Sequence, residues 1–141
     1  MPDKGNQIRG SIKIEEITTN ISWLAVIVGA VASFLVGWLW YSEKLFGKKW
    51  AEGLGLNLGS ASEMPALAMI LQLLGLLLMS WFVAVTAAND ALLTVILGTV
   101  AFTVLAYSGG TFAKQTSYVR NVNAGFWIVA LVVMIIVQGI L

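Results

Sequence analysis

The chain has 141 residues, of which 59% are hydrophobic and 11% charged, and its mean hydropathy is +0.89, a composition outside the usual range of soluble domains. Eight Lys and Arg residues against seven Asp and Glu residues give a formal charge of +1, which excludes the strongly basic surface that attracts nucleic acid. Because the sequence has no Cys and no His, disulfides, zinc sites, haem ligation by His and acid-base catalysis by His are also excluded.

The first 20 residues form a polar tail. Ile8, Ile12 and Ile14 alternate as in a strand. Ile14, Ile17 and Ile21 instead fit one face of a helix, so both structures remain open. We expect a short element at the membrane surface that could dock a partner. We reject a cleaved signal peptide because the apolar run that follows the tail is longer than the roughly 7 to 15 residues of a signal core and comes after an acidic flank.

Four runs without Asp, Glu, Lys or Arg are long enough to cross a bilayer. They are residues 21–42, 64–88, 91–113 and 124–141. A transmembrane helix needs about 20 apolar residues, and backbone within lipid must satisfy its hydrogen bonds internally. The sequence therefore predicts an all-α membrane protein in which residues 21–141 form a single domain of four transmembrane helices.

Polar residues at the edges of these runs predict where the helices begin. We expect Asn20 to cap the first helix, Ser62 to start the second, Asp90 to cap the third and Asn123 to cap the fourth, since short polar side chains bond to the free N–H groups of a first turn. The Asn89-Asp90 pair is a tight turn, which makes the second and third runs an antiparallel hairpin.

An aromatic and basic segment follows the first run. Its anchoring residues are Trp38, Trp40, Tyr41, Lys44, Phe46, Lys48, Lys49 and Trp50. Charged and aromatic residues lie on opposite helical faces between residues 43 and 63, as in an amphipathic helix at a membrane surface. Trp and Tyr prefer that interface, and Lys can reach lipid phosphates. We interpret the segment as an anchoring collar; the alternative is a ligand site.

The same segment has a similar stretch 66 residues further along. This shift aligns residues 39–48 with 105–114, and five of the ten positions are identical. The chain then consists of two helix pairs in the same orientation, an arrangement known in transporters whose sites lie at the repeat interface. The alternative is chance similarity between apolar segments.

The aromatic segment also carries a family motif, G-x-x-W-Y-S-x-x-x-F-G-x-x-W, formed by Gly37, Trp40, Tyr41, Ser42, Phe46, Gly47 and Trp50. It resembles the signature of a family of small bacterial membrane proteins, domain of unknown function 1761. The last run, which opens with Asn123-Ala-Gly125-Phe126-Trp127 and closes with Gly139-Ile-Leu141, is similar to the last helix of that family. The resemblance covers most of the chain from residue 21 onward and implies four transmembrane helices but no reaction. The tail is longer than the short tails of the family.

Small and polar residues within the runs predict how the helices pack. Gly29, Ser33 and Gly37 recur every four residues and form a face that lets another helix approach closely. Candidates for a polar pathway or small-solute pocket are Gln72, Ser80, Thr99, Thr103, Tyr107 and Gln138. We favour the alternative, ordinary adhesion between helices, because Ser and Thr can bond to their own backbone and ion-coupled pumps generally carry a charged group that these runs lack.

The distribution of Lys and Arg predicts the orientation. Five of these residues lie in the loops at 43–63 and 114–123, and three lie in the tail. By the positive-inside rule the two loops are cytoplasmic and both termini are outside. We expect an integral protein of the bacterial inner membrane.

Taken together, these patterns favour a non-catalytic four-helix membrane protein. We expect it to pack through its Gly and Ser faces into a homo-oligomer, or with other membrane subunits, within the lipid bilayer. The alternative is a small transporter or channel whose pathway runs between repeats or protomers. We expect no catalytic residues, no metal site, no cofactor and no nucleic-acid partner. The third hypothesis is an enzyme that acts on lipid headgroups. Its candidate acids and bases all lie at the expected membrane interface, and no two of them are spaced like a catalytic pair.

Overall fold

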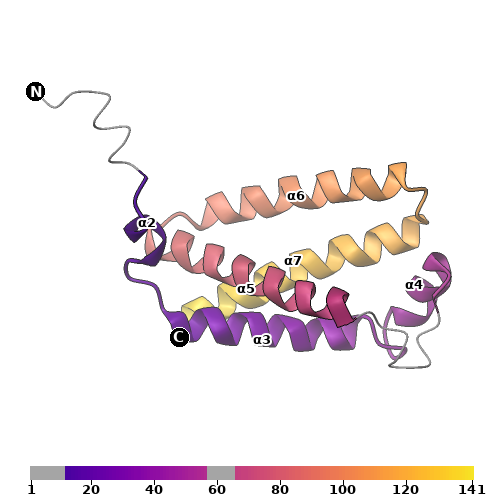
Figure 1. Cartoon of the computed structure of the whole chain (residues 1–141), viewed down its shortest axis with the longest axis horizontal. Helices are drawn as coiled ribbons and strands as arrows, with labels where there is room; N and C mark the ends of the chain where they lie inside the picture. The colour runs from indigo at the N-terminus through magenta and orange to yellow at the C-terminus, as the bar shows by residue number, and fades with distance from the viewer. Residues whose placement is uncertain (1–11, 57–65) are drawn as a thin grey trace, which may run out of the picture.

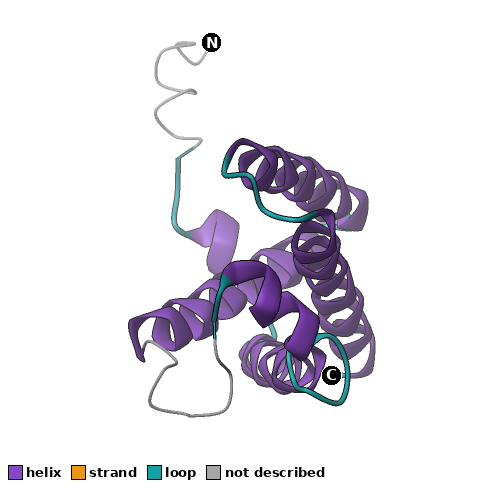
Figure 2. Cartoon of the chain, turned by 90° about the vertical axis from the view of Figure 1, so that its right-hand side faces the viewer, coloured by secondary structure: helices purple, strands orange, loops and turns teal. Residues whose placement is uncertain are grey.

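The computed structural model describes residues 12–56 and 66–141, and within these ranges the chain is built from helices and short connections (Figures 1 and 2). The helices are α2 (Glu15–Thr18), α3 (Trp23–Trp40), α4 (Gly47–Leu54), α5 (Ala66–Ala88), α6 (Leu92–Phe112) and α7 (Ser117–Ile140). Four of them, α3, α5, α6 and α7, are long and apolar enough to cross a membrane. The prediction of an all-α protein with four such helices is confirmed. The predicted start of the second helix at Ser62 lies outside the described residues.

The four long helices lie side by side, and consecutive ones run in opposite directions (Figure 1). Both α3 and α6 run toward the end of the molecule that carries α4, and both α5 and α7 run back toward the end that carries the C-terminus. The tight turn between α5 and α6 therefore lies at the opposite end from α4. The central helix is α7, which contacts α3, α4, α5 and α6, whereas α6 contacts α7 and, less extensively, α5.

The core is centred on α7. Its largest buried side chains are Phe126 and Met134, which belong to one cluster with Leu76 and Val83 of α5 and Val95 of α6. Lipid tails are as apolar as these side chains, so the hydrophobic effect does little to hold helices together within a bilayer. The bundle depends instead on van der Waals packing of complementary helix surfaces and on hydrogen bonds between helices.

The face formed by Gly29, Ser33 and Gly37 lies inside the bundle, where all three residues are buried. A Cβ atom added at Gly29 would lie 2.6 Å from the Ser80 hydroxyl oxygen, and one at Gly37 would lie 2.9 Å from the Phe126 ring. The face thus packs α3 against α5 and α7 of the same chain. Because it is occupied within the chain, it is not available to join a second copy as the sequence led us to expect.

The start of α3 differs from the prediction. The hydroxyl of Ser22, not the side chain of Asn20, caps this helix by accepting a hydrogen bond from the Ala25 N–H at 3.2 Å. Asn20 lies in the preceding turn with a φ of 57°. The third helix also lacks its predicted cap, because Asp90 adopts a φ of 52° in the turn and α6 begins after Ala91 without a side-chain cap.

The fourth long helix begins earlier than the charge-free run. It starts at Ser117, capped by the Thr116 hydroxyl, which accepts from the Val119 N–H at 3.2 Å. Asn123 therefore lies within α7 and is not its cap. The prediction placed the start of this helix too late because Arg120 bounds the charge-free run. A charged residue is nevertheless compatible with the first turns of a membrane helix, where its side chain can reach beyond the hydrocarbon.

The described part of the tail is attached to the bundle. The short helix α2 contacts α5, and the indole N–H of Trp81 donates to the backbone oxygen of Ile17 at 2.7 Å. The rings of Trp23 and Trp81 lie 5.5 Å apart beside this contact. Residues 12–20 thus dock on α5 of their own chain, and the rest of the tail lies outside the described residues.

Helix α4 has a charged side and an apolar side, but its apolar side has a protein partner. Lys48 and Glu52 are exposed, whereas Ala51 is buried, and a Cβ atom at Gly53 would lie 2.7 Å from Val119 of α7. Lys44 and Phe46 precede the helix and lie in the turn that leads into it. Placement of α4 at a membrane surface stays a prediction.

The layout predicts the accessibility of single cysteines introduced into this cysteine-free chain. Lys48→Cys lies in α4 and Asn89→Cys lies in the turn between α5 and α6, and these two elements are at opposite ends of the bundle (Figure 1). In sealed vesicles a membrane-impermeant maleimide should therefore label one position and spare the other. Lys114→Cys, in the turn just after α6, serves as the matched control and should be labelled from the same side as Lys48→Cys. Labelling of positions 48 and 89 from the same side would contradict the fold.

Candidate functional site

Two segments that are distant in sequence meet at the α4 end of the bundle. The Tyr41 hydroxyl donates to the side-chain oxygen Oδ1 of Asn123 at 2.8 Å, and the Trp50 indole N–H donates to the same oxygen at 2.9 Å. The Trp40 indole N–H donates to the backbone oxygen of Val122 at 3.0 Å. Burial raises the pKa of the Tyr41 phenol, so the hydroxyl keeps its proton and its role as donor. The polar tips of these three rings therefore end on α7, not among lipid headgroups as the collar interpretation assumed.

The rings of this cluster meet at steep angles. The centroids of Tyr41 and Trp50 lie 4.8 Å apart at an interplanar angle of 63°, and those of Tyr41 and Phe126 lie 5.6 Å apart at 67°. Trp40 and Phe46 lie 4.7 Å apart at 56°. Edge-to-face contacts of this kind are favourable because the positive edge of one ring faces the negative face of the other.

Glycines allow α3 and α7 to meet closely at this point. A Cβ atom at Gly37 of α3 would lie 2.9 Å from the Phe126 ring of α7, and one at Gly125 of α7 would lie 3.0 Å from the Trp40 ring of α3. Each helix thus presents a glycine to a large ring of the other. This reciprocal arrangement fixes the relative height of the two helices.

A tight turn brings Trp50 back beside Tyr41. The Phe46 N–H donates to the Trp40 oxygen at 3.2 Å, and the Gly47 N–H donates to the Ser42 oxygen at 2.9 Å. A Cβ atom at Gly47 would lie 2.6 Å from the backbone carbonyl carbon of Tyr41. Because backbone cannot move aside as a flexible side chain can, the turn requires glycine at this position.

A cavity of about 550 Å³ lies beside the cluster, within the usual size range of small-molecule sites. We call it the aromatic cavity after the rings that line it, which are Phe34, Trp38, Tyr41, Trp50, Phe126 and Trp127. Glu43 is the one charged residue in its lining among residues 12–56 and 66–141, and Asn123 and Gln72 are also part of the wall.

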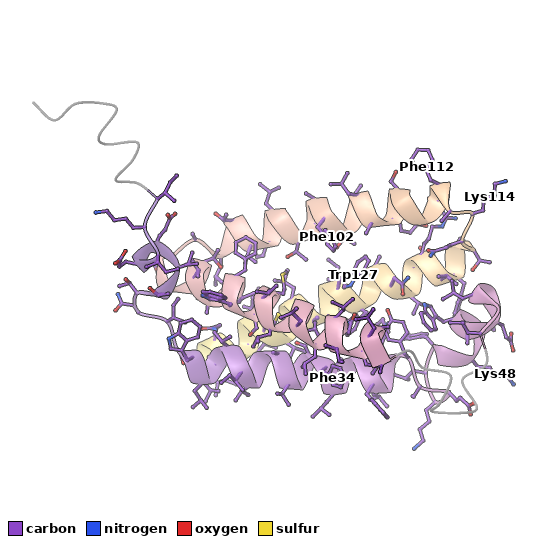
Figure 3. All side chains as sticks on the ribbon, in the orientation of Figure 1. Phe34, Lys48, Phe102, Phe112, Lys114 and Trp127 are labelled. Carbon is purple, nitrogen blue, oxygen red and sulfur yellow. The ribbon has the colours of Figure 1, made fainter. Side chains whose placement is uncertain are left out.

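A second cavity of about 470 Å³ lies between α5, α6 and α7, and we call it the α5–α6 groove. Its walls include Gly75, Gly98 and Phe102. The Thr99 hydroxyl also borders it and, within the part of the chain that the structure describes, is buried without a hydrogen-bond partner. Phe102 and Trp127 face each other between α6 and α7 (Figure 3), with ring centroids 5.4 Å apart.

The structure divides the predicted pathway residues among different places. Gln72 and Thr99 border the α5–α6 groove. The Ser80 hydroxyl instead donates to the backbone oxygen of Val26 at 2.7 Å and joins α5 to α3. Thr103 is buried on α6 and Gln138 is half-buried near the end of α7. The predicted residues therefore do not form one continuous polar surface.

Tyr107, the remaining candidate, belongs to a small cluster where α6 meets the start of α7. Its hydroxyl donates to the side-chain oxygen of Asn121 at 3.0 Å. The Arg120 guanidinium lies 4.9 Å from the centre of its ring and also donates to the Thr111 hydroxyl. Both tyrosines of the predicted repeat, Tyr41 and Tyr107, thus donate to asparagines of α7.

Sequence reasoning missed Asn123 as the shared acceptor, since it was interpreted as a helix cap. The signal that could have found it is the alternation of small and large residues that follows it, Gly125 and Phe126, which complements Gly37 and Trp40 of the first helix. Alternation of this kind is typical of two helices that interlock.

These contacts define a class of protein: a polytopic α-helical membrane protein whose first and last membrane helices interlock through an aromatic cluster. A family model described as "Protein of unknown function (DUF1761)" matches residues 24–139. The chain belongs to this family, as its motif predicted. No curated protein and no solved structure matches the chain.

The shared oxygen predicts the effect of Asn123→Ala on stability. The substitution leaves the Tyr41 hydroxyl and the Trp50 indole, both partly buried, without their acceptor. A fully buried donor without a partner costs about 1 to 3 kcal/mol. We expect unfolding in detergent, followed by tryptophan fluorescence, to show a loss of about 2 kcal/mol or more. The control is Asn121→Ala, which removes one exposed bond and should cost much less. Equal losses would contradict the role assigned to Asn123.

Proposed function

We propose that this membrane protein of the DUF1761 family is a non-catalytic subunit that assembles with a second copy of itself through α5 and α6. The α5–α6 groove is the observation that carries this proposal. Within the bilayer such a groove is filled either by lipid or by protein, and its walls favour protein for the reasons that follow. The proposal assigns no catalytic residue, and it retains the cytoplasmic placement of the α4 end.

The groove has the small-residue walls that membrane helices use to associate. Apart from the adjoining backbone of α5, no described atom lies within 4 Å of a Cβ atom built at Gly75. A Cβ atom at Gly98 would meet Phe82 at the ordinary distance of 3.6 Å. A second backbone could therefore approach Gly75 closely, whereas the Gly98 position is already in contact with Phe82 of the same chain. An open glycine favours helix association in lipid. Thr99 also borders the groove, but its hydroxyl is buried within the described part of the chain.

A second copy is the partner that the shape of this surface favours. Beside the groove, α6 presents an apolar ridge in which Leu93, Leu97 and Leu105 are 79%, 72% and 71% exposed. A symmetric dimer requires the same patch on both subunits, with ridge and groove lying side by side. The face formed by α5 and α6 has both, whereas the Gly29 face of α3 is already occupied within the chain.

A small transporter or channel has weaker support. The observation in its favour is that Gln72, Leu76 and Trp127 border both cavities, so the aromatic cavity and the α5–α6 groove adjoin. Against it, the linings of both cavities are mainly apolar. The hydroxyl of Ser80, one of the candidate pathway residues, instead donates to a backbone oxygen of α3. Solute flux in proteoliposomes that disappears with Gln72→Leu would favour the transporter over the assembly subunit.

The proposal predicts that filling the groove separates the subunits. We expect the wild-type protein to have the mass of a dimer in mild detergent, and Gly75→Leu to shift it to monomer because the added side chain occupies the space of the incoming helix. Gly139→Leu is the matched control, since a Cβ atom there also has no described atom within 4 Å but lies outside the groove. The measurement is light scattering coupled to size-exclusion chromatography, corrected for bound detergent. A wild-type protein that is monomeric at all concentrations, or equal effects of the two variants, would overturn the proposal.

A further inference from the structure

We propose that the aromatic cavity binds an organic ammonium group, carried either by the headgroup of a membrane lipid or by a free amphipathic cation. This inference does not rest on the dimer proposed above. The cavity lies between the end of α3, α4, α5 and α7, and it shares Gln72, Leu76 and Trp127 with the α5–α6 groove. The inference rests on the kinds of ring in the lining, on their rigid placement and on the charge at the cavity.

The lining has the chemistry that recognises ammonium ions. The faces of aromatic rings carry a negative potential, and tryptophan provides the strongest attraction for a cation. Trp38, Trp50 and Trp127 are half of the six rings that line the cavity. Because Tyr41 meets both Trp50 and Phe126 at more than 60°, these rings form the walls of a corner and do not stack into a flat layer.

Two of the walls are fixed before a ligand arrives. The Tyr41 hydroxyl and the Trp50 indole are both held by Asn123, so their rings lose little freedom on binding. A site whose side chains are already ordered binds more tightly than one that must order them. The same hydrogen bonds satisfy the polar groups of Tyr41 and Trp50, so the apolar parts of these rings remain available to a ligand.

The charges around the cavity suit an ammonium group that is linked to a phosphate. Glu43 supplies a negative charge to the described lining, while Lys44 and Lys48 are exposed on the adjoining turn and helix and are not part of that lining. Lys49 points elsewhere, with its Nζ atom 5.7 Å from the Tyr118 ring. A zwitterionic headgroup could therefore place its ammonium among the rings and its phosphate toward Lys44 and Lys48.

The rest of the lining accepts an apolar chain. Met69 and Leu76 of α5 continue the wall away from Glu43, toward the part of the bundle that the hydrocarbon surrounds. An amphiphile can thus bind with its head among the rings and its tail along α5. The cavity volume of about 550 Å³ exceeds what a small inorganic cation would fill, which favours a bulky organic group.

The test compares headgroups on identical chains. Full-length protein in an uncharged maltoside detergent is titrated with dihexanoyl phosphatidylcholine and with dihexanoyl phosphatidylglycerol, and binding is followed by tryptophan fluorescence. We expect the phosphocholine lipid to bind roughly tenfold more tightly, a difference of about 1.4 kcal/mol. Equal affinities for the two lipids would overturn the proposal.

A second arm identifies the source of the ammonium group. Tetramethylammonium chloride is added in competition with the phosphocholine lipid, with sodium chloride at equal ionic strength as its control. Displacement by tetramethylammonium alone supports a site for free organic cations, and failure to displace a lipid that discriminates between headgroups supports a lipid site. Equal displacement by both salts shows a general effect of ionic strength and overturns the proposal.

Paired variants locate the binding. Glu43→Gln removes the charge at the cavity and should weaken phosphocholine binding about fivefold to tenfold. Glu52→Gln removes an equivalent charge from the exposed side of α4, outside the described lining, and should leave binding unchanged. Both positions are exposed, so both variants are expected to fold, and an unchanged unfolding midpoint confirms this. Equal effects of the two variants, or none, contradict the assignment.

Discussion

The side-chain oxygen of Asn123 is the point on which the α4 end of the bundle depends. It accepts hydrogen bonds from Tyr41, at the end of α3, and from Trp50, within α4, and it belongs to α7. Three segments are thus tied to one atom. Both donors are partly buried, and a polar group that is buried without a partner is costly. The position of α4 on the bundle follows from this requirement.

The spacing of the family motif follows from the same constraint. Gly37 and Trp40 are placed to meet Phe126 and Gly125 of α7, one glycine facing one ring in each direction. Gly47 then allows the chain to reverse beside the backbone of Tyr41. As a result, α4 can place the Trp50 ring in the aromatic cluster. The motif that identifies the family is therefore a packing motif, and several of its residues also line the aromatic cavity.

The sequence was sufficient to predict the four long helices and their alternating directions, because charge-free length and short turns are local properties. It was not sufficient to predict where the aromatic side chains point. Trp40 and Tyr41 suit a membrane interface by residue type alone, yet their partners lie 82 residues away on α7. Nor could it show that Gly29 serves the chain's own α5, since a small-residue face suits contacts within and between chains equally.

The predicted repeat offers a physical reason for the difference between α3 and α6. Shifting by 66 residues replaces Gly37 with Thr103, Trp40 with Ala106 and Trp50 with Thr116, while the tyrosine that bonds to an asparagine of α7 remains. Under this alignment the second half keeps the hydrogen bond but loses the glycine and the rings that interlock. Without them α6 cannot engage α7 as α3 does. It contacts the bundle less extensively, and the α5–α6 groove remains beside it. In the proposed dimer, this less extensively packed helix is the one that would meet the second subunit.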